Sequence, residues 1–209
     1  MTTPLPADAE TLFARLRDSL KDALGVSCNG QAQEGPDALA GVDPTMPVGE
    51  SAAGSGSEAA QAGSVDAPAF IGIHTGGAWL AARLHAELGL SSPLGFLSSA
   101  FYRDDVQARG LSTRMQPTRI DFDVNGRDIV LVDDILHTGR TIRAALNEIF
   151  DYGRPARVRL AVLIDRGERE LPVQPDHVGT RLVLLPGEKL ALSQRTNGMF
   201  ELRVETVQA

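Results

Sequence analysis

Residues 128–146 have the sequence DIVLVDDILHTGRTIRAAL, and the rest of the chain is best interpreted outward from them. Residues 129–132 form a continuous apolar run, which is typical of a strand buried on both faces of a parallel sheet. Asp133 and Asp134 follow at the carboxyl end of this strand, where open α/β sheets bind ligands. Adjacent carboxylates there accept hydrogen bonds from a cis-diol, so the stretch predicts a site for the 2′ and 3′ hydroxyls of a ribose.

The next five residues, HTGRT at 137–141, suit a phosphate group. Gly139 permits a positive φ, Thr138 and Thr141 offer hydroxyls, and the helix predicted over 142–149 directs its free N–H groups at the loop. The alternative interpretation is a tight turn in which the two acids serve only capping and solubility. Neither GxxxxGK[ST] nor a GxGxxG that follows a strand occurs, so P-loop and Rossmann sites are disfavoured.

The segment VLVDDILHTGRT resembles the phosphoribosyl-pyrophosphate (PRPP) motif of the type I phosphoribosyltransferases. The stretches GIHTGG at 72–77, FYRDD at 101–105, DYGRP at 151–155 and DRGERELP at 165–172 resemble the pyrimidine operon regulators that double as uracil phosphoribosyltransferases. The resemblance implies an α/β fold with a central, mostly parallel sheet, flanking helices and a small hood.

The resemblance also assigns roles to residues of this chain. Asp133 and Asp134 are implied as the catalytic residues, which hold the ribose hydroxyls together with the Mg²⁺ that accompanies PRPP. Asp165 and Arg166 are implied in the base-binding region, and Arg169 as an RNA contact. The residues implied in PRPP binding are Thr75, Gly76, Gly77, Arg103, Asp133, Asp134, Ile135, Leu136, His137, Thr138, Gly139, Arg140 and Thr141.

Two of these assignments have simpler alternatives. The HTGG turn at 74–77 is implied as the pyrophosphate loop, but glycine-rich βα connections are weak signals in isolation. Relatives often place a basic residue and an arginine where this chain has His74 and Gly76, so backbone N–H groups would carry more of the binding. Arg103, in a polar stretch that resembles the mobile flap of these enzymes, would either pair with pyrophosphate or form a surface ion pair with Asp105.

Composition predicts one α/β domain with an appendage. The chain has 209 residues, of which 43% are hydrophobic. We expect an N-terminal helix of the domain in residues 1–27, a disordered low-complexity insertion in 28–67, and the core with its hood in 68–209. The insertion has no Lys, Arg or aromatic residue and carries six of the acids behind the net charge of −7. A partner-binding tail is the alternative for this insertion.

Other features narrow the cellular context. The single cysteine, Cys28, cannot form an internal disulfide and has no neighbouring metal ligand. No stretch has the length and apolarity of a membrane span or a signal peptide, so the sequence predicts a cytoplasmic protein. The remaining elements are predicted as a helix over 12–24, a helix over 76–88, strands at 69–73, 94–101 and 157–164, and hood strands at 178–185 and 200–204.

The resemblance implies a reaction, uracil and PRPP to UMP and diphosphate, and a regulatory role on pyrimidine mRNA leaders. RNA contact is expected to be weak, because Glu168 and Gln174 stand where the family has a His and an Arg, and only Arg169 persists. The alternatives are a regulator that binds nucleotide with little catalysis and a purine phosphoribosyltransferase. Purine relatives have an Asp where His137 stands, and His137 is either an acid or base or a solvated loop residue. A homodimer or homotetramer is implied.

Overall fold

The computed structural model describes residues 2–26, 67–98 and 116–206. Its centre is a five-stranded sheet with the strand order β2-β1-β3-β4-β5, in which every neighbouring pair is parallel. This confirms the predicted parallel sheet. The strands are β1 (Ala69–Ile73), β2 (Leu94–Leu97), β3 (Asp128–Leu136), β4 (Arg157–Asp165) and β5 (His177–Arg181).

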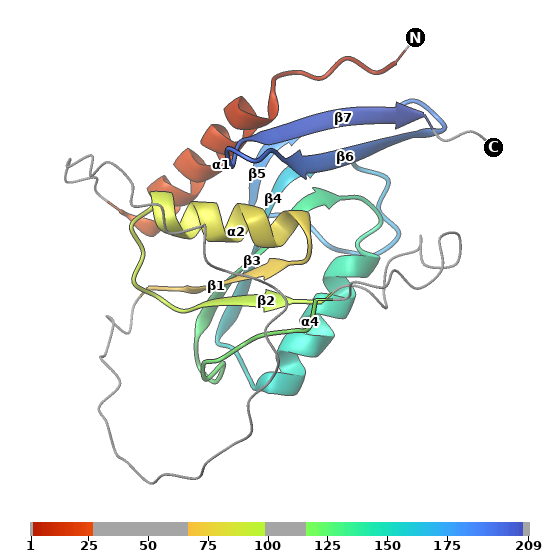
Figure 1. Cartoon of the computed structure of the whole chain (residues 1–209). Helices are drawn as coiled ribbons and strands as arrows, with labels where there is room; N and C mark the ends of the chain where they lie inside the picture. The colour runs from red at the N-terminus through yellow and green to blue at the C-terminus, as the bar shows by residue number, and fades with distance from the viewer. Residues whose placement is uncertain (1, 27–66, 99–115, 207–209) are drawn as a thin grey trace, which may run out of the picture.

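Helices cover both faces of the sheet (Figure 1). Helices α1 (Ala9–Leu24) and α2 (Gly76–Glu87) pack on one face, and α4 (Arg140–Tyr152) packs on the other. Strand β3 lies in the middle and contributes to both cores: Val130 and Val132 face α1 and α2, whereas Ile129 and Leu131 face α4. A strand buried on both faces needs apolar residues at every position, which explains the unbroken run in the sequence.

The predicted N-terminal helix is confirmed and is attached firmly to the body. The Asp8 side chain caps its first turn by accepting from Thr11 N at 2.9 Å, and Gly25 ends it with a φ of 63°. Arg83 of α2 lies 4.4 Å from the centre of the Phe13 ring and forms an ion pair with Glu10 at 2.7 Å. The helix is therefore fixed by polar contacts as well as by its leucines.

The hood is a two-stranded antiparallel ribbon of β6 (Glu188–Gln194) and β7 (Phe200–Thr206). The strand predicted at 200–204 is confirmed, but the assignment of 178–185 to the hood is wrong. Residues His177–Arg181 are β5, which pairs with β4 at the edge of the central sheet. The true partner of β7 is β6, which the sequence prediction missed.

Two sequence predictions concern residues outside the described ranges. These are the disordered insertion, apart from Ala67 at its end, and Arg103 with most of the flap-like stretch around it. Among the residues that the structure does describe, no helix is long and apolar enough to cross a membrane.

Candidate active site

Strand β3 is longer than the apolar run predicts, and this changes the setting of the two acids. The strand continues to Leu136, so Asp133 and Asp134 lie inside it rather than after its end. Because successive side chains of a strand point to opposite faces, Asp134 shares the face of Val132 and α2, and Asp133 shares the face of α4. The two carboxylates have different neighbours, although both lie in the last four residues of β3, near the carboxyl edge of the sheet.

Both acids are buried and bound to the local backbone. Asp133 is 5% exposed and Asp134 is 8% exposed. Asp133 Oδ1 accepts from Asp134 N at 3.0 Å, and Asp134 Oδ1 accepts from Ile135 N at 3.0 Å. These contacts fix the orientation of each carboxylate before any ligand binds, which is what a preorganised site for hydroxyl groups needs.

The glycines of the HTGG turn allow this loop to lie directly against the acids. A β-carbon on Gly76 would come within 2.3 Å of Asp134 Oδ2, and one on Gly77 within 2.4 Å of Val132 O. Real β-carbons do not approach other atoms so closely, so only glycine fits at either position. The loop between β1 and α2 and the acidic end of β3 therefore form one continuous surface.

His74 brings no positive charge to this loop. Burial lowers the pKa of its imidazole below the usual value, so the ring is neutral at physiological pH. Its backbone N–H donates to Leu97 O at 2.8 Å, and its ring centre lies 5.6 Å from that of Phe96. The peptide bond between His74 and Thr75 is cis. Because His74 is neutral, the loop offers backbone groups and uncharged side chains to a ligand.

The loop on the other side of the acids begins a helix. Gly139 has a φ of 92° and is the N-cap of α4, and as a glycine it has no side chain that could cap the helix. Thr138 Oγ1 accepts from Arg140 N at 3.3 Å, and Thr141 stands on the first turn. Free N–H groups at a helix N-terminus attract anions, so this loop has the properties of a phosphate site.

The connection between β4 and β5 reaches residues 137–141, the phosphate-type loop. Asp165 is 7% exposed and Arg166 is partly buried, and the Arg166 N–H donates to Leu136 O at 2.8 Å. Arg166 Nε is buried and has no hydrogen-bond partner among the described residues. The two residues implied in base binding thus adjoin the end of β3 and the loop that follows it.

Exposed ion pairs also join the two segments. His137 Nε2 lies 3.0 Å from Glu168 Oε2, and an Arg166 nitrogen lies 3.4 Å from the same oxygen. Arg140 pairs with Glu170 at 2.6 Å. His137 is therefore a loop residue whose side chain is 38% exposed and contacts a carboxylate of the neighbouring segment.

Arg169 is placed differently from the RNA contact that the resemblance implies. Its side chain is only 16% exposed and forms an ion pair with Asp165 at 2.5 Å. Its other nitrogens donate to backbone carbonyl oxygens. A guanidinium used in this way inside the protein is poorly available to RNA phosphates, so the geometry speaks against that assignment.

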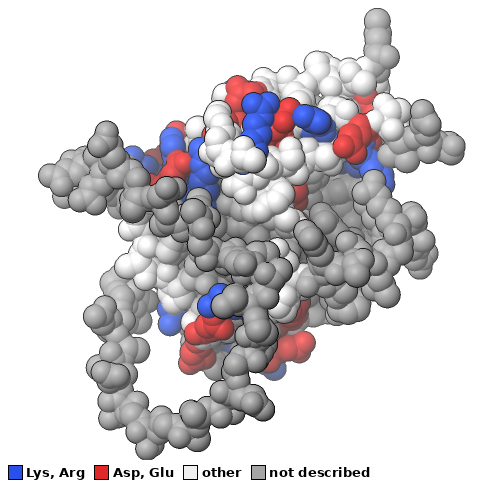
Figure 2. Space-filling model, in the orientation of Figure 1, with Lys and Arg blue, Asp and Glu red and all other residues white. Residues whose placement is uncertain are grey.

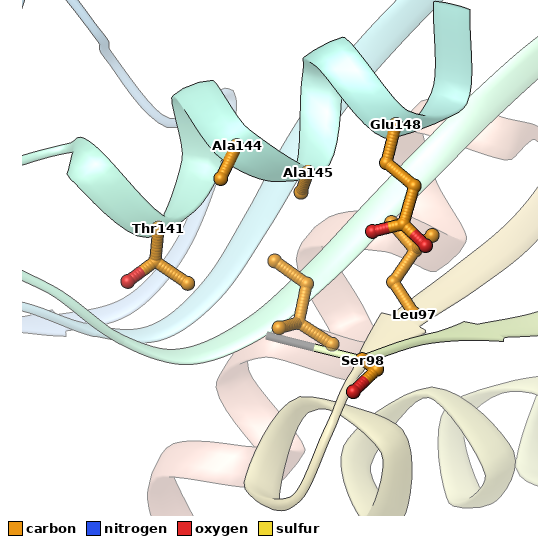
Figure 3. A pocket seen from close by; sticks show the side chains of 7 residues that line it. Leu97, Ser98, Thr141, Ala144, Ala145 and Glu148 are labelled. Carbon is orange, nitrogen blue, oxygen red and sulfur yellow. The ribbon is translucent and has the colours of Figure 1, made fainter. Parts of the chain in front are cut away.

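A narrow depression lies between α4 and the ends of β1 and β2. Thr141, Ala144, Ala145 and Glu148 line it from α4, and Leu97 and Ser98 line it from the end of β2 (Figure 3). Glu148 accepts a short hydrogen bond from the Thr118 hydroxyl, whose oxygen accepts from Ser98 N at 3.0 Å. Sequence reasoning missed Glu148 because its partners are remote in the chain.

The acids suit a magnesium ion that arrives with its substrate. Mg²⁺ prefers oxygen ligands, keeps several waters and is usually bound by one or two carboxylates together with substrate phosphates. Asp133 and Asp134 supply such carboxylates. No group of three or more His, Cys, Asp or Glu that could hold a metal is found in the part of the chain that the structure describes. The protein's share of the coordination would be these two side chains.

Comparisons with known proteins agree with the geometry. A family model described as the phosphoribosyl transferase domain matches residues 57–183. Relatives from Nitrosococcus oceani and Ralstonia nicotianae, both named bifunctional protein PyrR, are each 56% identical to this chain, over 128 and 127 residues. The matched parts cover 60% and 61% of this chain and 72% of each relative. The chain belongs to the phosphoribosyltransferase family and, within it, to the PyrR proteins.

Solved structures share the fold at low identity. The hypoxanthine phosphoribosyltransferase of Trypanosoma cruzi is 17% identical, with a TM-score of 0.51, and the match covers 86% of this chain and 81% of that one. A hypoxanthine-guanine phosphoribosyltransferase from Bacillus anthracis is 14% identical, with a TM-score of 0.51, and the match covers 88% and 82%. These likenesses establish the type I phosphoribosyltransferase fold and do not bear on the base that is used.

Proposed function

We propose that the protein transfers the phosphoribosyl group of PRPP to N1 of uracil, forming UMP and diphosphate. The observation that carries this proposal is the order of three features along one edge of the sheet. Asp134 at the end of β3 lies against Gly76 of one loop, and β3 leads directly into the helix N-terminus at Gly139. Sugar diol, diphosphate and 5-phosphate are the three groups that such an arrangement would bind.

In this reaction the bond from the anomeric carbon to the diphosphate oxygen breaks, and its electron pair leaves with diphosphate. N1 of uracil forms the new bond to that carbon, and its proton passes to the departing diphosphate or to water. The ribose carbon gains positive character in the transition state, so nearby fixed carboxylates stabilise it. Asp133 and Asp134 supply this negative field, and their backbone hydrogen bonds hold them in place.

The chain acts chiefly by positioning, and no covalent nucleophile is required. Gly76 and Gly77 would let backbone N–H groups approach the diphosphate, and the α4 N-terminus with Thr138 and Thr141 would bind the 5-phosphate. Mg²⁺ bound with PRPP would offset the charge of the leaving diphosphate, held on the protein side by Asp133 and Asp134.

Base specificity calls for a direct test. Purified protein with Mg²⁺ and PRPP is offered uracil, cytosine, hypoxanthine, guanine and adenine in parallel, and the nucleoside monophosphates are separated by chromatography. We expect UMP to be formed at least about a hundredfold faster than any purine nucleotide, because sites that hydrogen-bond a base reject analogues strongly. Faster formation of IMP or GMP would show that the protein is a purine enzyme. If no nucleotide is formed from any base, the protein is a regulator that binds nucleotide without catalysis.

We propose a second function, the regulation of pyrimidine biosynthesis genes, on the ground that the relatives are named bifunctional. RNA binding needs a positive surface. On the face shown in Figure 2, the described Lys and Arg side chains are interspersed with Asp and Glu. In the hood, Arg195 and Arg203 both pair with Glu201. This face is therefore a poor RNA platform, and regulation would use either weak leader contacts or a protein partner.

A filter-binding titration with the leader RNA of a pyrimidine operon tests this second function. We expect weak binding with a shallow dependence on salt, since the slope reports the number of phosphates neutralised. Tight, UMP-responsive binding with a steep slope would establish direct RNA control instead. The proposed reaction implies a cytoplasmic protein, because PRPP is an intracellular metabolite, and the family suggests a homodimer or homotetramer, which sedimentation would measure.

A further inference from the structure

Residues 165–173, which begin at the end of β4, enclose the loop that starts α4. The backbone N–H groups of Glu170 and Leu171 both donate to Thr138 O, at 3.0 and 3.1 Å. Gly139 is also covered by this segment, since a β-carbon there would lie 3.4 Å from the Leu171 side chain. The segment implied in base binding is therefore attached to the loop with phosphate-site geometry, and the two cannot move independently without breaking these contacts.

Arg169 is the centre of this attachment. Its Nη1 donates to three carbonyl oxygens, those of His137, Gly167 and Leu136, at 2.7, 3.0 and 3.4 Å. Its Nε donates to Val173 O at 3.0 Å. One side chain thus joins the end of β3, the phosphate-type loop and both ends of the turn that contains Arg169 itself.

The charge of Arg169 is matched inside the protein. Its Nη2 lies 2.5 Å from Asp165 Oδ1, and the Asp165 side chain is 9% exposed. The same oxygen accepts from Gly167 N at 3.0 Å. Removing one partner of a buried ion pair leaves an uncompensated charge, so the pair resists rearrangement. A lysine cannot replace the fork, because its single ammonium lacks the planar, divergent donors of a guanidinium.

We propose that Arg169 is a positioning residue that sets the phosphate-binding loop and the base-binding segment at a fixed separation. The inference rests on the proposed function and deepens it, since it concerns how one site recognises the two ends of a nucleotide at once. Arg169 touches no substrate in this account. It acts through the carbonyl groups of Leu136 and His137 on one side and through Asp165, Gly167 and Val173 on the other.

The competing role for Arg169 is an RNA contact. RNA phosphates would have to be bound by a guanidinium that is 16% exposed and already donates to four carbonyl groups and a carboxylate. Taking this donor away from the carbonyls of His137, Gly167 and Val173 would cost free energy. The positioning role uses the contacts as they stand, and the two roles predict different losses when Arg169 is changed.

The test compares UMP, which would contact both the phosphate-type loop and the base-binding segment, with ribose 5-phosphate, which would contact only the loop. Titration calorimetry measures UMP, ribose 5-phosphate and leader RNA on wild type, Arg169→Lys, Arg169→Gln and the hood control Arg203→Gln, after thermal melting has shown that each variant is folded. Arg203 is 66% exposed and lies in β7, so its variant matches the loss of one arginine outside the site.

We expect both Arg169 variants to bind UMP about tenfold or more weakly, since misplacement by about 1 Å costs up to a hundredfold in related situations. Ribose 5-phosphate should lose less than about threefold, and Arg203→Gln should match wild type. Equal losses for UMP and ribose 5-phosphate, or unchanged UMP binding, overturn the positioning role. Lost RNA binding with unchanged UMP binding assigns Arg169 to RNA instead.

A second measurement needs no variant and holds if the substitutions prevent folding. Amide hydrogen exchange is followed in the wild-type protein with and without ribose 5-phosphate. Binding at the phosphate-type loop should slow exchange at Glu170 and Leu171, whose N–H groups donate to Thr138 O. No protection there, with clear protection at residues 138–141, overturns the coupling. A wild type that binds neither UMP nor PRPP overturns the proposed function, and the inference with it.

Discussion

Two loop segments of the site, the HTGG turn and residues 165–173, are held in place in different ways. The HTGG turn approaches Asp134 by having no side chains at Gly76 and Gly77, and its one titratable group, His74, is held neutral by burial. The segment 165–173 is instead held to the phosphate-type loop by charged side chains, with Arg169 at the centre. Substitutions in the HTGG turn should therefore all have large effects on activity. In residues 165–173 the effect of a substitution should depend on how buried the charged side chain is.

The largest effect is expected from Asp134, the acid against which the HTGG turn packs. Asp134→Asn keeps the size of the side chain but removes its charge and one acceptor oxygen, so the ribose diol and the positive transition state both lose stabilisation. We expect kcat for UMP formation to fall by about 10²–10³, the range seen when one preorganised electrostatic group is removed. Steady-state kinetics measure this. The exposed Asp151→Asn on α4 is the control and should keep wild-type kcat.

The second largest effect is expected where the HTGG turn approaches Asp134. Gly76→Ala places a β-carbon 2.3 Å from Asp134 Oδ2, so the loop or the carboxylate must shift. We expect kcat/KM for PRPP to fall by about a hundredfold. Gly89→Ala is the matched control, since that glycine has a φ of 61° and no atom within 4 Å of its β-position.

The Gly89 control should lose about 1–2 kcal/mol of stability through its left-handed backbone and keep its KM for PRPP. If Gly76→Ala behaves in the same way, with lower stability and normal kinetics, the close packing of the turn against Asp134 has no bearing on the reaction. Melting curves and initial rates on the same preparations separate the two cases.

A smaller effect is expected from the neutral histidine of the HTGG turn. Burial lowers the pKa of His74 below its unfolded value of about 6.5. Between the two pKa values the unfolded chain binds more protons than the folded one, so the free energy of unfolding falls as the pH falls. The contribution of His74 to stability is therefore complete above about pH 6.5 and is lost as the pH falls through the folded pKa. Replacing His74 with Gln should flatten the fall in melting temperature between pH 7 and pH 5.

His177 gives an internal reference for this measurement. Burial is also the main cause that lowers its pKa, but it lies on β5 against Ser19 of α1, away from the acids. A His177→Gln variant should flatten the same stability curve and leave the kinetics of PRPP unchanged. An NMR titration in which the His74 ring protonates above pH 6.5 would show that the HTGG turn carries a positive charge after all.

The smallest effect is expected at the exposed pair of the other loop. Glu168 is 58% exposed and His137 is 38% exposed, so their contact contributes no more than about 1 kcal/mol. Glu168→Gln should change the KM for PRPP and uracil by less than about fivefold, far less than the changes at buried Arg169. A larger change would mean that exposed charges, and not the buried network, hold the two loops together.

The sequence predicts the frame of this site well because each part has a local signal. The run at 129–132 is apolar since both faces of β3 are covered, and Gly139 and Thr138 stand where a phosphate loop requires them. The packing of Gly76 against Asp134 needs the topology as well, because β1 and β3 are neighbours only in the folded sheet. The central fold follows from patterns that short segments contain.

Other features have no such signal. The role of Arg169 depends on four backbone carbonyls, and a carbonyl is the same in every residue, so no residue pattern identifies its partner. The separation of Asp133 and Asp134 by the pleat depends on where β3 ends, and apolar Ile135 and Leu136 were the only indication that it continues. Strand β5, with the sequence HVGTR, is too polar to be recognised as part of a buried sheet.

We infer that PRPP binds to the acids of β3, the HTGG turn and the loop at residues 137–141. Titration calorimetry of PRPP in the presence and absence of Mg²⁺, on wild type and on Asp134→Asn, tests it most directly. We expect saturable binding by wild type that depends on magnesium and is strongly weakened in the variant. Magnesium-independent binding of equal strength by both proteins, or no binding by wild type, would contradict it.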